Sequence, residues 1–269
     1  MLISVVTISF NQGKYLPRCI QSVVKQSYKD YEYIIIDAGS TDNSRNIIDH
    51  YQHFFAKKIF ESDDGPADGL NKGFSHATGE IFFYLNADDE IDQHAFRVAA
   101  NFFKSHPTTD VILGNGYHID RDSKIIRRIY SSPWNTRHYA AGLSNAIQQS
   151  TFFRRSAFYC AGGFNVENRT CWDGELLVDM ALKGSKIDLI DNYIGKFRIY
   201  AESITGSGRL KAMVREDRLR IAKKILNRPP DWRELILHYG VRAFRVAHNP
   251  RRTLDKISYL LSRTRKKSI

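Results

Sequence analysis

The sequence predicts an α/β fold built on a mixed, mostly parallel sheet with flanking helices, and two observations support this prediction. Short apolar runs, too brief for buried helices, alternate along the chain with segments whose apolar residues recur every three or four positions. Alternation at this spacing is typical of βαβ units, in which a helix connects one strand to the next parallel strand. The length of 269 residues is sufficient for one large domain, or for a domain with an extension.

The N-terminal part of the chain is expected to contain four strands, each followed by a helix. Each predicted strand is rich in β-branched or aromatic residues and ends in a polar, turn-prone segment. Gly79 ends the third helix directly before the fourth strand. The predicted strands are residues 2–8, 33–36, 57–61 and 80–85, and the predicted helices are residues 16–24, 47–51, 70–77 and 95–103.

The rest of the chain is predicted to add further strands and a second group of helices. The clearest element is a helix over residues 173–182, which ends at Gly184. From residue 210 onward the pattern is helical and basic, with breaks at Pro229 and Pro250. The other apolar runs, predicted as strands, are residues 111–114, 125–130 and 150–153.

The net charge of +11 lies almost entirely in the C-terminal segment. From residue 205 to the end there are 18 Lys and Arg against 5 Asp and Glu, whereas the first 204 residues hold 22 against 24. A basic segment on a nearly neutral body favours an acidic partner surface, either an anionic membrane or a nucleic acid. No zinc spacing or RNA-recognition aromatic pattern accompanies it, so we expect no nucleic-acid partner. The alternative is that these helices pack on the body or on a second subunit, with their charges solvated.

Cysteine usage and the N-terminus favour a cytoplasmic location. Cys19, Cys160 and Cys171 are an odd number of cysteines without CxxC spacing, which indicates neither a disulfide framework nor a zinc site. The apolar N-terminal run lacks a basic leader and is interrupted at Asn11, so a strand is expected there rather than a signal peptide. No apolar run approaches the ~18 residues of a membrane span. We therefore expect a cytoplasmic protein, with peripheral contact to the inner face of the plasma membrane through the basic segment.

Two adjacent carboxylates, Asp88 and Asp89, follow the fourth predicted strand. Open α/β sheets bind their ligands at the carboxyl ends of the strands. Adjacent carboxylates resist ionisation unless a cation or hydrogen bonds compensate, and such oxygens suit Mg²⁺ or Mn²⁺ shared with substrate phosphates. The sequence therefore predicts a divalent-cation site at Asp88 and Asp89, beside Asn86. The alternative is that the acidic residues 88–92 cap the helix over residues 95–103.

Polar loops after the first and second predicted strands are expected at the same edge of the sheet. Because the carboxyl ends of parallel strands share an edge, these loops can converge with Asp88 on one ligand. For Asp37 the alternative is a residue that shapes a local turn before the next helix. The loop residues that we assign to this ligand site are Ser9, Phe10, Asn11, Asp37 and Ser40.

A further polar group lies on one side of the third predicted helix. Asp68, Asn71 and Lys72 are spaced at i, i+3 and i+4, which makes them neighbours on a helix surface. We assign them to the same ligand site, and the alternative is a solvated helix face. The chain contains neither GxGxxG nor GxxxxGK[ST], which excludes a dinucleotide fingerprint and a Walker loop.

Three segments occur in the order SVVTISFNQGKYLPRCIQSVVKQSYKDYEYIIIDAGSTDNS, DDGPADGLNKGFSHATGE and FFYLNADDE. Together they resemble the family 2 glycosyltransferases, and the resemblance extends to about residue 205. It implies the GT-A fold, a Rossmann-like nucleotide-sugar-binding domain. It also implies a catalytic domain over residues 1–205, with a nucleotide-sugar half over residues 1–105 and an acceptor half over residues 106–205, followed by a basic helical extension over residues 206–269.

The resemblance implies roles for residues of the donor half. The loop after the first strand and Asp37 would hold the nucleotide base. Asn86, Asp88 and Asp89 correspond to the family's DxD region, which holds the divalent cation and the diphosphate. Asn86 stands where the first aspartate of that motif is usual, which reduces the number of carboxylates available to the cation.

The resemblance implies further roles in the acceptor half. The segment CWDGELLVDMALKG is similar to the family's pattern at the catalytic base, which implies Asp173, with Glu175 as the second candidate. From the residues alone, the alternative is that Asp173 caps a helix. Arg198 opens a segment that resembles the family's late R-x-H-x-x-S loop, which closes over the diphosphate, and Tyr200 replaces the histidine.

These implications predict an inverting, metal-dependent glycosyltransferase of bacterial cell-surface polysaccharide or lipid-linked glycan synthesis. The donor would be a nucleotide-sugar, with a UDP-sugar favoured, and the acceptor a hydroxyl of a glycan or of a lipid-linked molecule. The cation would neutralise the leaving group, and one carboxylate would deprotonate the acceptor. Two alternatives are a nucleotidyltransferase and a nucleic-acid-binding protein that acts through the basic segment. A homo-oligomer is also compatible with the sequence.

Overall fold

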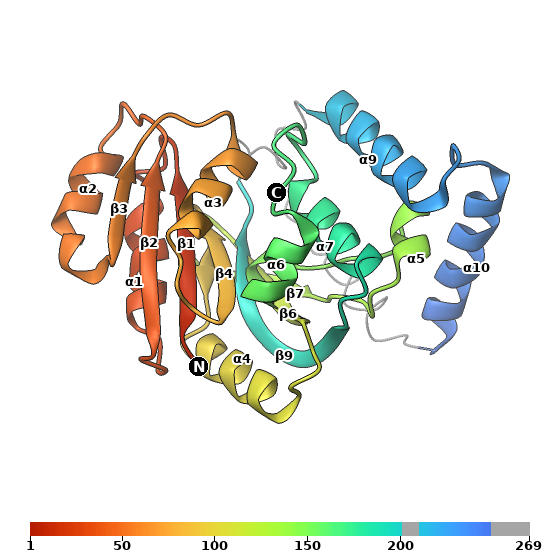
Figure 1. The fold of residues 1–269 in the computed structure, drawn as a ribbon, viewed down its shortest axis with the longest axis horizontal. Helices are drawn as coiled ribbons and strands as arrows, with labels where there is room; N and C mark the ends of the chain where they lie inside the picture. The colour runs from red at the N-terminus through yellow and green to blue at the C-terminus, as the bar shows by residue number, and fades with distance from the viewer. Residues whose placement is uncertain (201–209, 249–269) are drawn as a thin grey trace, which may run out of the picture.

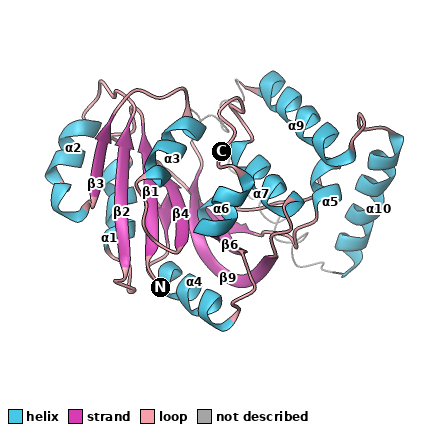
Figure 2. Ribbon diagram, viewed as in Figure 1, coloured by secondary structure: helices cyan, strands magenta, loops and turns pink. Residues whose placement is uncertain are grey.

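A mixed nine-stranded sheet with helices on both faces forms the centre of the molecule (Figure 1, Figure 2). The computed structural model describes residues 1–200 and 210–248, with side chains up to residue 243. The strand order is β3-β2-β1-β4-β8-β6-β9-β5, and β7 pairs with β6. The predicted sheet with flanking helices is therefore present, and its first four strands are parallel.

The N-terminal half has the four predicted strands and helices. Alternate residues of β1 face opposite sides: Val5 packs in one hydrophobic cluster with α1, α2 and α4, and Val6 packs in another with α3. Both faces are covered, which explains why these strands read as continuous apolar runs. The elements are β1 (Ile3–Ser9), α1 (Leu16–Val24), β2 (Tyr31–Asp37), α2 (Ser44–His50), η1 (Gln52–Phe54), β3 (Lys57–Phe60), α3 (Pro66–Ser75), β4 (Ile81–Asn86) and α4 (Ala95–Ser105).

The second half extends the same sheet with antiparallel and parallel strands. The long strand β9 (Ile187–Arg198) was not predicted, because its polar residues interrupt the apolar pattern and only four of its positions are buried. It pairs in parallel with β6 and antiparallel with β5, and so brings its last residue, Arg198, back to the acidic loop that follows β4. The other elements are β5 (Glu90–Ile91), β6 (Val111–Ile119), β7 (Ile125–Ile129), α5 (Thr136–Ala140), η2 (Gln148–Ser150), β8 (Thr151–Arg154), α6 (Arg155–Ala161) and α7 (Trp172–Leu182).

The basic C-terminal segment contributes two helices, α9 (Lys211–Leu226) and α10 (Trp232–His248). The predicted break at Pro229 lies between them, after Asn227 ends α9 in the left-handed conformation. The predicted boundary between residues 205 and 206, and the second predicted break at Pro250, lie outside the described residues. Among the described helices, none is long and apolar enough to cross a membrane.

Helix α9 packs on the body of the fold, which is the alternative that the sequence left open. Ile221 of α9 is fully buried and packs with Val178 of α7 and with Cys171. Arg220 forms a bidentate ion pair with the buried carboxylate of Glu175, at 2.6 and 2.7 Å. These hydrogen bonds lower the pKa of Glu175 to about 2, although burial alone would raise it. Helix α9 is therefore part of the folded body and not a separate basic tail.

We expect Arg220→Ala to lower the free energy of unfolding by about 2 kcal/mol at neutral pH. Breaking a fully buried ion pair costs about 3–5 kcal/mol, and the partial exposure of Arg220 reduces this value. Because the pKa of Glu175 is lowered from 4.5 to about 2, its contribution is present above about pH 4.5 and is lost as the pH falls toward 2. Denaturant unfolding at several pH values should therefore show a difference between the two proteins that narrows in acid.

Arg215→Ala is the matched control, because Arg215 is exposed on the same helix and makes no ion pair with a described residue. It should unfold like the parent protein. Equal destabilisation by both substitutions would mean that helix propensity or net charge, and not the contact with Glu175, holds α9 in place.

Candidate functional site

The loops that follow β1, β2 and β4 lie together at one edge of the sheet, as the sequence predicted. The strand register sets Ser9 beside Asp37 and Ile8 beside Asn86. Ser9, Asp37 and Asn86 each end their strand, so the three neighbouring parallel strands end within about one residue of the same level. The arrangement places the polar ends of three strands where open α/β sheets hold their ligands.

Asp37 uses its two carboxylate oxygens in different ways. Its Oδ1 accepts hydrogen bonds from the backbone N–H groups of Gly39 and Ser40, at 3.1 and 2.9 Å, and from Nε of Arg45 at 2.9 Å. Its Oδ2 is buried and has no hydrogen-bond partner among the described residues. Burial raises the pKa of Asp37, but hydrogen bonds from Ser40 and Arg45 more than offset this, so the carboxyl stays ionised. The turn and the ligand interpretations are thus compatible, because Oδ1 shapes the turn and Oδ2 remains available.

Asn11 connects the first loop to the second loop through hydrogen bonds of its backbone and its side chain. The backbone N–H of Asn11 donates to Oγ of Ser40 at 2.8 Å, and Oδ1 of Asn11 accepts from the N–H of Thr41 at 2.8 Å. Asn11 itself has a positive φ of 54°, which asparagine tolerates better than most residues. The side chains of Asn11 and Ser40 therefore fix the loops. Phe10 next to them is 59% exposed, and Oγ of Ser9 is buried without a described partner.

Asp88 and Asp89 point into different surroundings. Asp89 is only 1% exposed, and both of its oxygens accept hydrogen bonds, Oδ1 from the N–H of Arg198 at 2.8 Å and Oδ2 from Nε2 of Gln149 at 2.6 Å. Asp88 is less buried, and its Oδ2 accepts from the hydroxyl of Tyr200 at 2.8 Å. Asp89 therefore has a structural role here, and Asp88 is the better candidate for a cation ligand.

Burial raises the pKa of both carboxyl groups, and that of Asp89 well above its usual range because the charge of Asp88 adds to the effect. A cation beside Asp88 would relieve this repulsion. Of the acidic residues 88–92 that could cap α4, Asp92 does shape the turn before that helix, where its Oδ1 accepts from the N–H of His94 at 3.0 Å. Asp88 and Asp89 instead accept from Tyr200, Arg198 and Gln149.

The structure gives Arg198 a different role from the predicted one. We assigned it to the donor site, yet it is completely buried and all five of its side-chain N–H groups are used within the protein. Nε donates to the carbonyl oxygen of Asp88 at 2.7 Å, and the guanidinium also lies 4.9 Å from the ring centroid of Tyr15. The remaining acceptors are the carbonyl oxygens of Asp120 and Arg121, Oγ of Ser123 and the carboxylate of Glu90. Arg198 therefore holds the acidic loop in place and has no donor left for a diphosphate.

Tyr200 is a site residue that the sequence did not place in the donor site. Its hydroxyl donates to Asp88 and accepts a hydrogen bond from Nε2 of Gln12 at 3.4 Å. Its ring lies 4.9 Å from that of Tyr15 in α1's N-cap position. Tyr200 thus connects the loop after β1 to the acidic loop. The sequence did contain a sign of this role, because Tyr200 occupies the position of a histidine in the related late loop. Residues 201–203 of that segment lie outside the described residues.

Asp173 lies in the first turn of α7, directly after Trp172. Trp172 packs against Tyr84 of β4, with ring centroids 5.4 Å apart. Desolvation by the surrounding protein raises the pKa of Asp173, although the residue keeps some exposed surface, and the charge of Arg218 from α9 lowers it in part. Its Oδ1 accepts from the N–H of Gly174 at 2.8 Å, and within the described part of the chain no side chain donates to it.

Asp173 is not the N-cap of α7. That position belongs to Cys171, whose N–H donates to Oδ1 of Asn168 at 2.8 Å. A Cβ at Gly174 would overlap the hydroxyl of Tyr139, so glycine allows α5 to approach the first turn closely. Asp173 is therefore a partly exposed carboxyl with a raised pKa, surrounded by aromatic side chains.

Glu175, the second candidate for the base, is corrected by the structure. It is fully buried, and in addition to Arg220 it accepts from Nδ2 of Asn168 at 2.7 Å and from Nδ2 of Asn165 at 3.2 Å. With its pKa lowered to about 2 it is a very weak base. Its function is to connect α7 to α9.

The three polar residues of α3 divide into two groups. Asn71 binds the backbone of Phe164 through both ends of its amide, at 2.8 and 2.9 Å, so its role is to hold the chain before α7. Asp68 and Lys72 form an i, i+4 ion pair at 2.8 Å, and Nζ of Lys72 also donates to the carbonyl of Ser62 at 2.7 Å. Only Asp68 and Lys72 remain partly exposed with charges that a donor could use.

The model of the family described as Glycosyl transferase family 2 matches residues 4–162. The chain belongs to glycosyl transferase family 2. It is 29% identical over 183 residues to a PGL/p-HBAD biosynthesis glycosyltransferase of Mycobacterium tuberculosis, covering 64% of this chain and 67% of that protein. It is 39% identical over 123 residues to an uncharacterized glycosyltransferase of Nostoc sp., covering 45% of this chain but only 37% of that relative.

Solved structures confirm the predicted GT-A fold. Staphylococcus aureus TarS 1–349 superposes with a TM-score of 0.67 at 18% identity, over 93% of this chain and 73% of that one. The mannosyltransferase PcManGT from Pyrobaculum calidifontis, in complex with GDP-Man and Mn²⁺, superposes with a TM-score of 0.60 at 16% identity, over 98% of this chain and 86% of that one.

The residues of this family 2 member fit a divalent cation in one respect. Oδ1 of Asn86 is a buried oxygen without a described partner, and it lies on the same loop as Asp88. No described group of three or more His, Cys, Asp or Glu side chains could hold a metal by itself. One carboxylate with one neutral oxygen is nevertheless a donor set that Mg²⁺ or Mn²⁺ accepts when substrate phosphates and water supply the rest.

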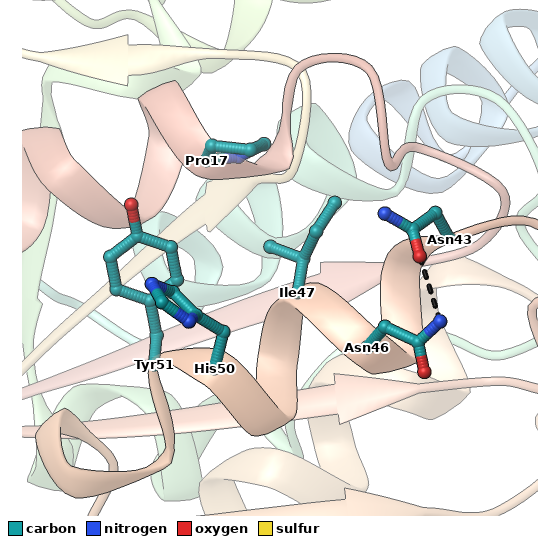
Figure 3. A pocket seen from close by; sticks show the side chains of 6 residues that line it. All are labelled: Pro17, Asn43, Asn46, Ile47, His50 and Tyr51. Carbon is teal, nitrogen blue, oxygen red and sulfur yellow. Dashed lines mark hydrogen bonds between the residues drawn. The ribbon is translucent and has the colours of Figure 1, made fainter.

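A groove of about 310 Å³ lies between α1 and α2 of this family 2 chain (Figure 3). It is lined by Pro17, Asn43, Asn46, Ile47, His50 and Tyr51. None of these residues belongs to the candidate site, and the groove contains no carboxylate. We therefore assign the site from the strand ends and not from this groove.

We expect Asp89→Asn, but not Asp88→Asn, to destabilise the protein. In Asp89→Asn the new amide must turn its NH₂ toward one of the two groups that donate to Asp89. The protein should therefore unfold at a lower temperature, and its free energy of unfolding should fall by roughly 1–3 kcal/mol. Asp88→Asn can still accept from Tyr200 and should unfold like the parent protein. Calorimetry of the two variants checks this; a stable Asp89→Asn protein would contradict the structural role of Asp89.

Proposed function

We propose that this chain is an inverting glycosyltransferase that moves a sugar from a nucleotide-sugar donor to an acceptor hydroxyl. One observation supports the proposal: Asp88 follows β4 at the edge of the sheet where Asp37 presents a buried, unpartnered oxygen, and Asp173 follows Trp172, whose ring packs against Tyr84 of β4. Asp88 suits the leaving diphosphate, Asp173 suits the acceptor, and Asp37 suits the base of the nucleotide.

On the donor side, a bound divalent cation would neutralise the charge that develops on the leaving nucleoside diphosphate. Asp88 and Asn86 are the residues that would hold it. Ionised Asp37 would accept a hydrogen bond from an N–H of the base, and the exposed ring of Phe10 offers a surface for stacking. TarS has been crystallised with UDP and UDP-GlcNAc, and PcManGT with GDP-Man. We propose a UDP-sugar for this chain.

On the acceptor side, Asp173 would remove the proton of the attacking hydroxyl. A carboxyl with a raised pKa is a stronger base than an ordinary aspartate, and it must be ionised to act. A single displacement with one base inverts the anomeric centre, whereas retaining glycosidases need two carboxyl groups about 5 Å apart. Tyr139 and Trp134, whose buried Nε1 has no described partner, provide aromatic and donor groups near this residue.

We propose a glycan or lipid-linked acceptor, in the synthesis of bacterial cell-surface polysaccharide or glycolipid, at the cytoplasmic face of the membrane. The mycobacterial relative is named for PGL/p-HBAD biosynthesis, which supports an acceptor of this class. The alternative of nucleotidyl transfer has no support in the loop after β1. The N–H groups of Asn11, Gln12 and Gly13 are bound to Ser40, Ser44 and Asp42, at 2.8, 3.2 and 2.9 Å, and cannot cradle a triphosphate.

We expect Asp173→Asn to abolish transfer while the chain still binds its donor. The amide preserves the shape of the side chain but cannot accept a proton, and loss of a general base typically costs about 10²–10⁴ in rate. In the parent protein kcat should fall in acid with a midpoint above the ordinary value of 3.8, because the pKa of Asp173 is raised. Stopped assays over a range of pH check both points. An unchanged kcat in Asp173→Asn would contradict the assignment of Asp173 as the general base.

We expect Asp88→Asn to weaken Mn²⁺-dependent donor binding and to lower the rate by about 10²–10³, the usual cost of one lost electrostatic contact. Calorimetric titration of the donor with and without Mn²⁺ measures the first effect directly. Full activity of the parent protein in excess EDTA, or equal Mn²⁺ dependence in Asp88→Asn, would contradict the metal site.

A further inference from the structure

Helix α10 exposes a continuous apolar stripe. Trp232, Leu235, Ile236 and Tyr239 are 63, 60, 63 and 68% exposed. They stand at positions i, i+3, i+4 and i+7, which share one face of a helix. Large apolar side chains that are exposed singly are ordinary, but four on a single helix face form a contact surface.

The opposite face of α10 rests on the body. Leu237, His238 and Val241 are less exposed than the stripe, and Nδ1 of His238 lies 2.9 Å from the carbonyl oxygen of Ala141, just after α5. Figure 1 shows α10 at the edge of the molecule, beside α5 and far from the sheet. The helix is thus held from behind, and the stripe on its other face has no described partner.

Cationic side chains flank the stripe on both sides. At 3.6 residues per turn, Arg233 and Arg242 lie about 100° and about 80° from Trp232 in opposite directions around the helix. Both are exposed. The two acidic residues nearby, Asp231 and Glu234, are paired with Arg228 at 3.1 and 2.7 Å. Arg233 and Arg242 on the flanks of the stripe therefore favour an anionic partner.

We propose that the α10 stripe docks on an anionic lipid bilayer, with the helix lying in the plane of the interface. Apolar side chains would enter the headgroup boundary, Trp232 and Tyr239 would sit at its polar edge, and Arg233 and Arg242 would contact lipid phosphates. A second copy of the chain fits less well. A symmetric pair would bring like charges together, and four side chains fall short of the ~800 Å² per partner of a standard interface.

Docking through α10 would also orient the acceptor side. The helix rests on the loop that carries α5, and Tyr139 of α5 contacts the first turn of α7 next to Asp173. A bilayer against α10 would therefore lie close to the acceptor loop, which suits a lipid-linked acceptor. This consequence rests on the proposed function, whereas the docking itself does not.

Vesicle flotation of the full chain tests the proposal with matched variants. The probes are vesicles of phosphatidylcholine alone and of equimolar phosphatidylglycerol and phosphatidylcholine. Ile236→Ser should weaken binding to the anionic vesicles about tenfold, because one buried aliphatic side chain contributes about that factor. Ile125→Ser is the control, since Ile125 is 59% exposed on β7, nearly as much as Ile236. It should bind like the parent protein.

The charges are tested in the same assay. In low salt, the double variant Arg233→Gln/Arg242→Gln should bind anionic vesicles about tenfold or more weakly than the parent protein. Added salt should weaken the binding of the parent protein in the same way. Lys25→Gln/Lys183→Gln removes two exposed charges from the body and should have no effect.

Three results would overturn the proposal. The first is equal binding to neutral and anionic vesicles, and the second is an equal loss of binding in Ile125→Ser and Ile236→Ser. The third is a dimer in sedimentation that Ile236→Ser dissociates, which would assign the stripe to a second copy. Donor hydrolysis in solution separates this test from the proposed function, because a chain that floats with anionic vesicles yet turns over no nucleotide-sugar would leave the docking intact and remove the enzyme assignment.

Discussion

The guanidinium of Arg198 holds the loop on which the donor site depends. It is buried at the end of β9, and its donors bind the loop before β5 and the turn between β6 and β7. A guanidinium presents five donors in a fixed plane, so one side chain can fix several carbonyl oxygens that would otherwise be buried without partners. Its backbone N–H also binds Asp89. Asp89 and Arg198 thus position Asp88 from behind, leaving Asp88 toward the ligand edge.

The two candidate catalytic carboxyl groups depend on different parts of the chain. Asp88 is positioned by β9, which runs through the acceptor half before it reaches the donor half. Asp173 is positioned by α7, and α7 is fixed by the ion pair between Glu175 and Arg220. Helix α9 also places the charge of Arg218 near Asp173. The basic segment, which charge alone would assign to a partner, is therefore divided: α9 serves the site, and α10 carries the exposed stripe.

The sequence predicted those features that depend on neighbouring residues, and it missed those that depend on contacts between distant parts of the chain. The first four strands and their loops were predictable, because buried parallel strands are continuous apolar runs and their polar ends are local. The strand β9 was missed because its burial depends on β6 and β5, which lie far away in the sequence. Glu175 and Arg198 were assigned to chemistry for the same reason. Each matched a local motif, and only a distant partner, Arg220 or the acidic loop, shows that its charge is already used.

Tyr200 shows how a substitution in a motif changes the properties of the site. A neutral phenol donates to Asp88, which lowers the pKa of that carboxyl in part, whereas a histidine at this position would add a group that titrates near neutral pH. Burial and the charge of Asp88 raise the pKa of Tyr200 above its usual range, so the hydroxyl keeps its proton throughout the physiological range. The donor of the hydrogen bond to Asp88 is consequently insensitive to pH, and the acid sensitivity of the site lies in its carboxyl groups. A tyrosine also packs against Tyr15, so the residue that contacts Asp88 is held by the N-cap of α1.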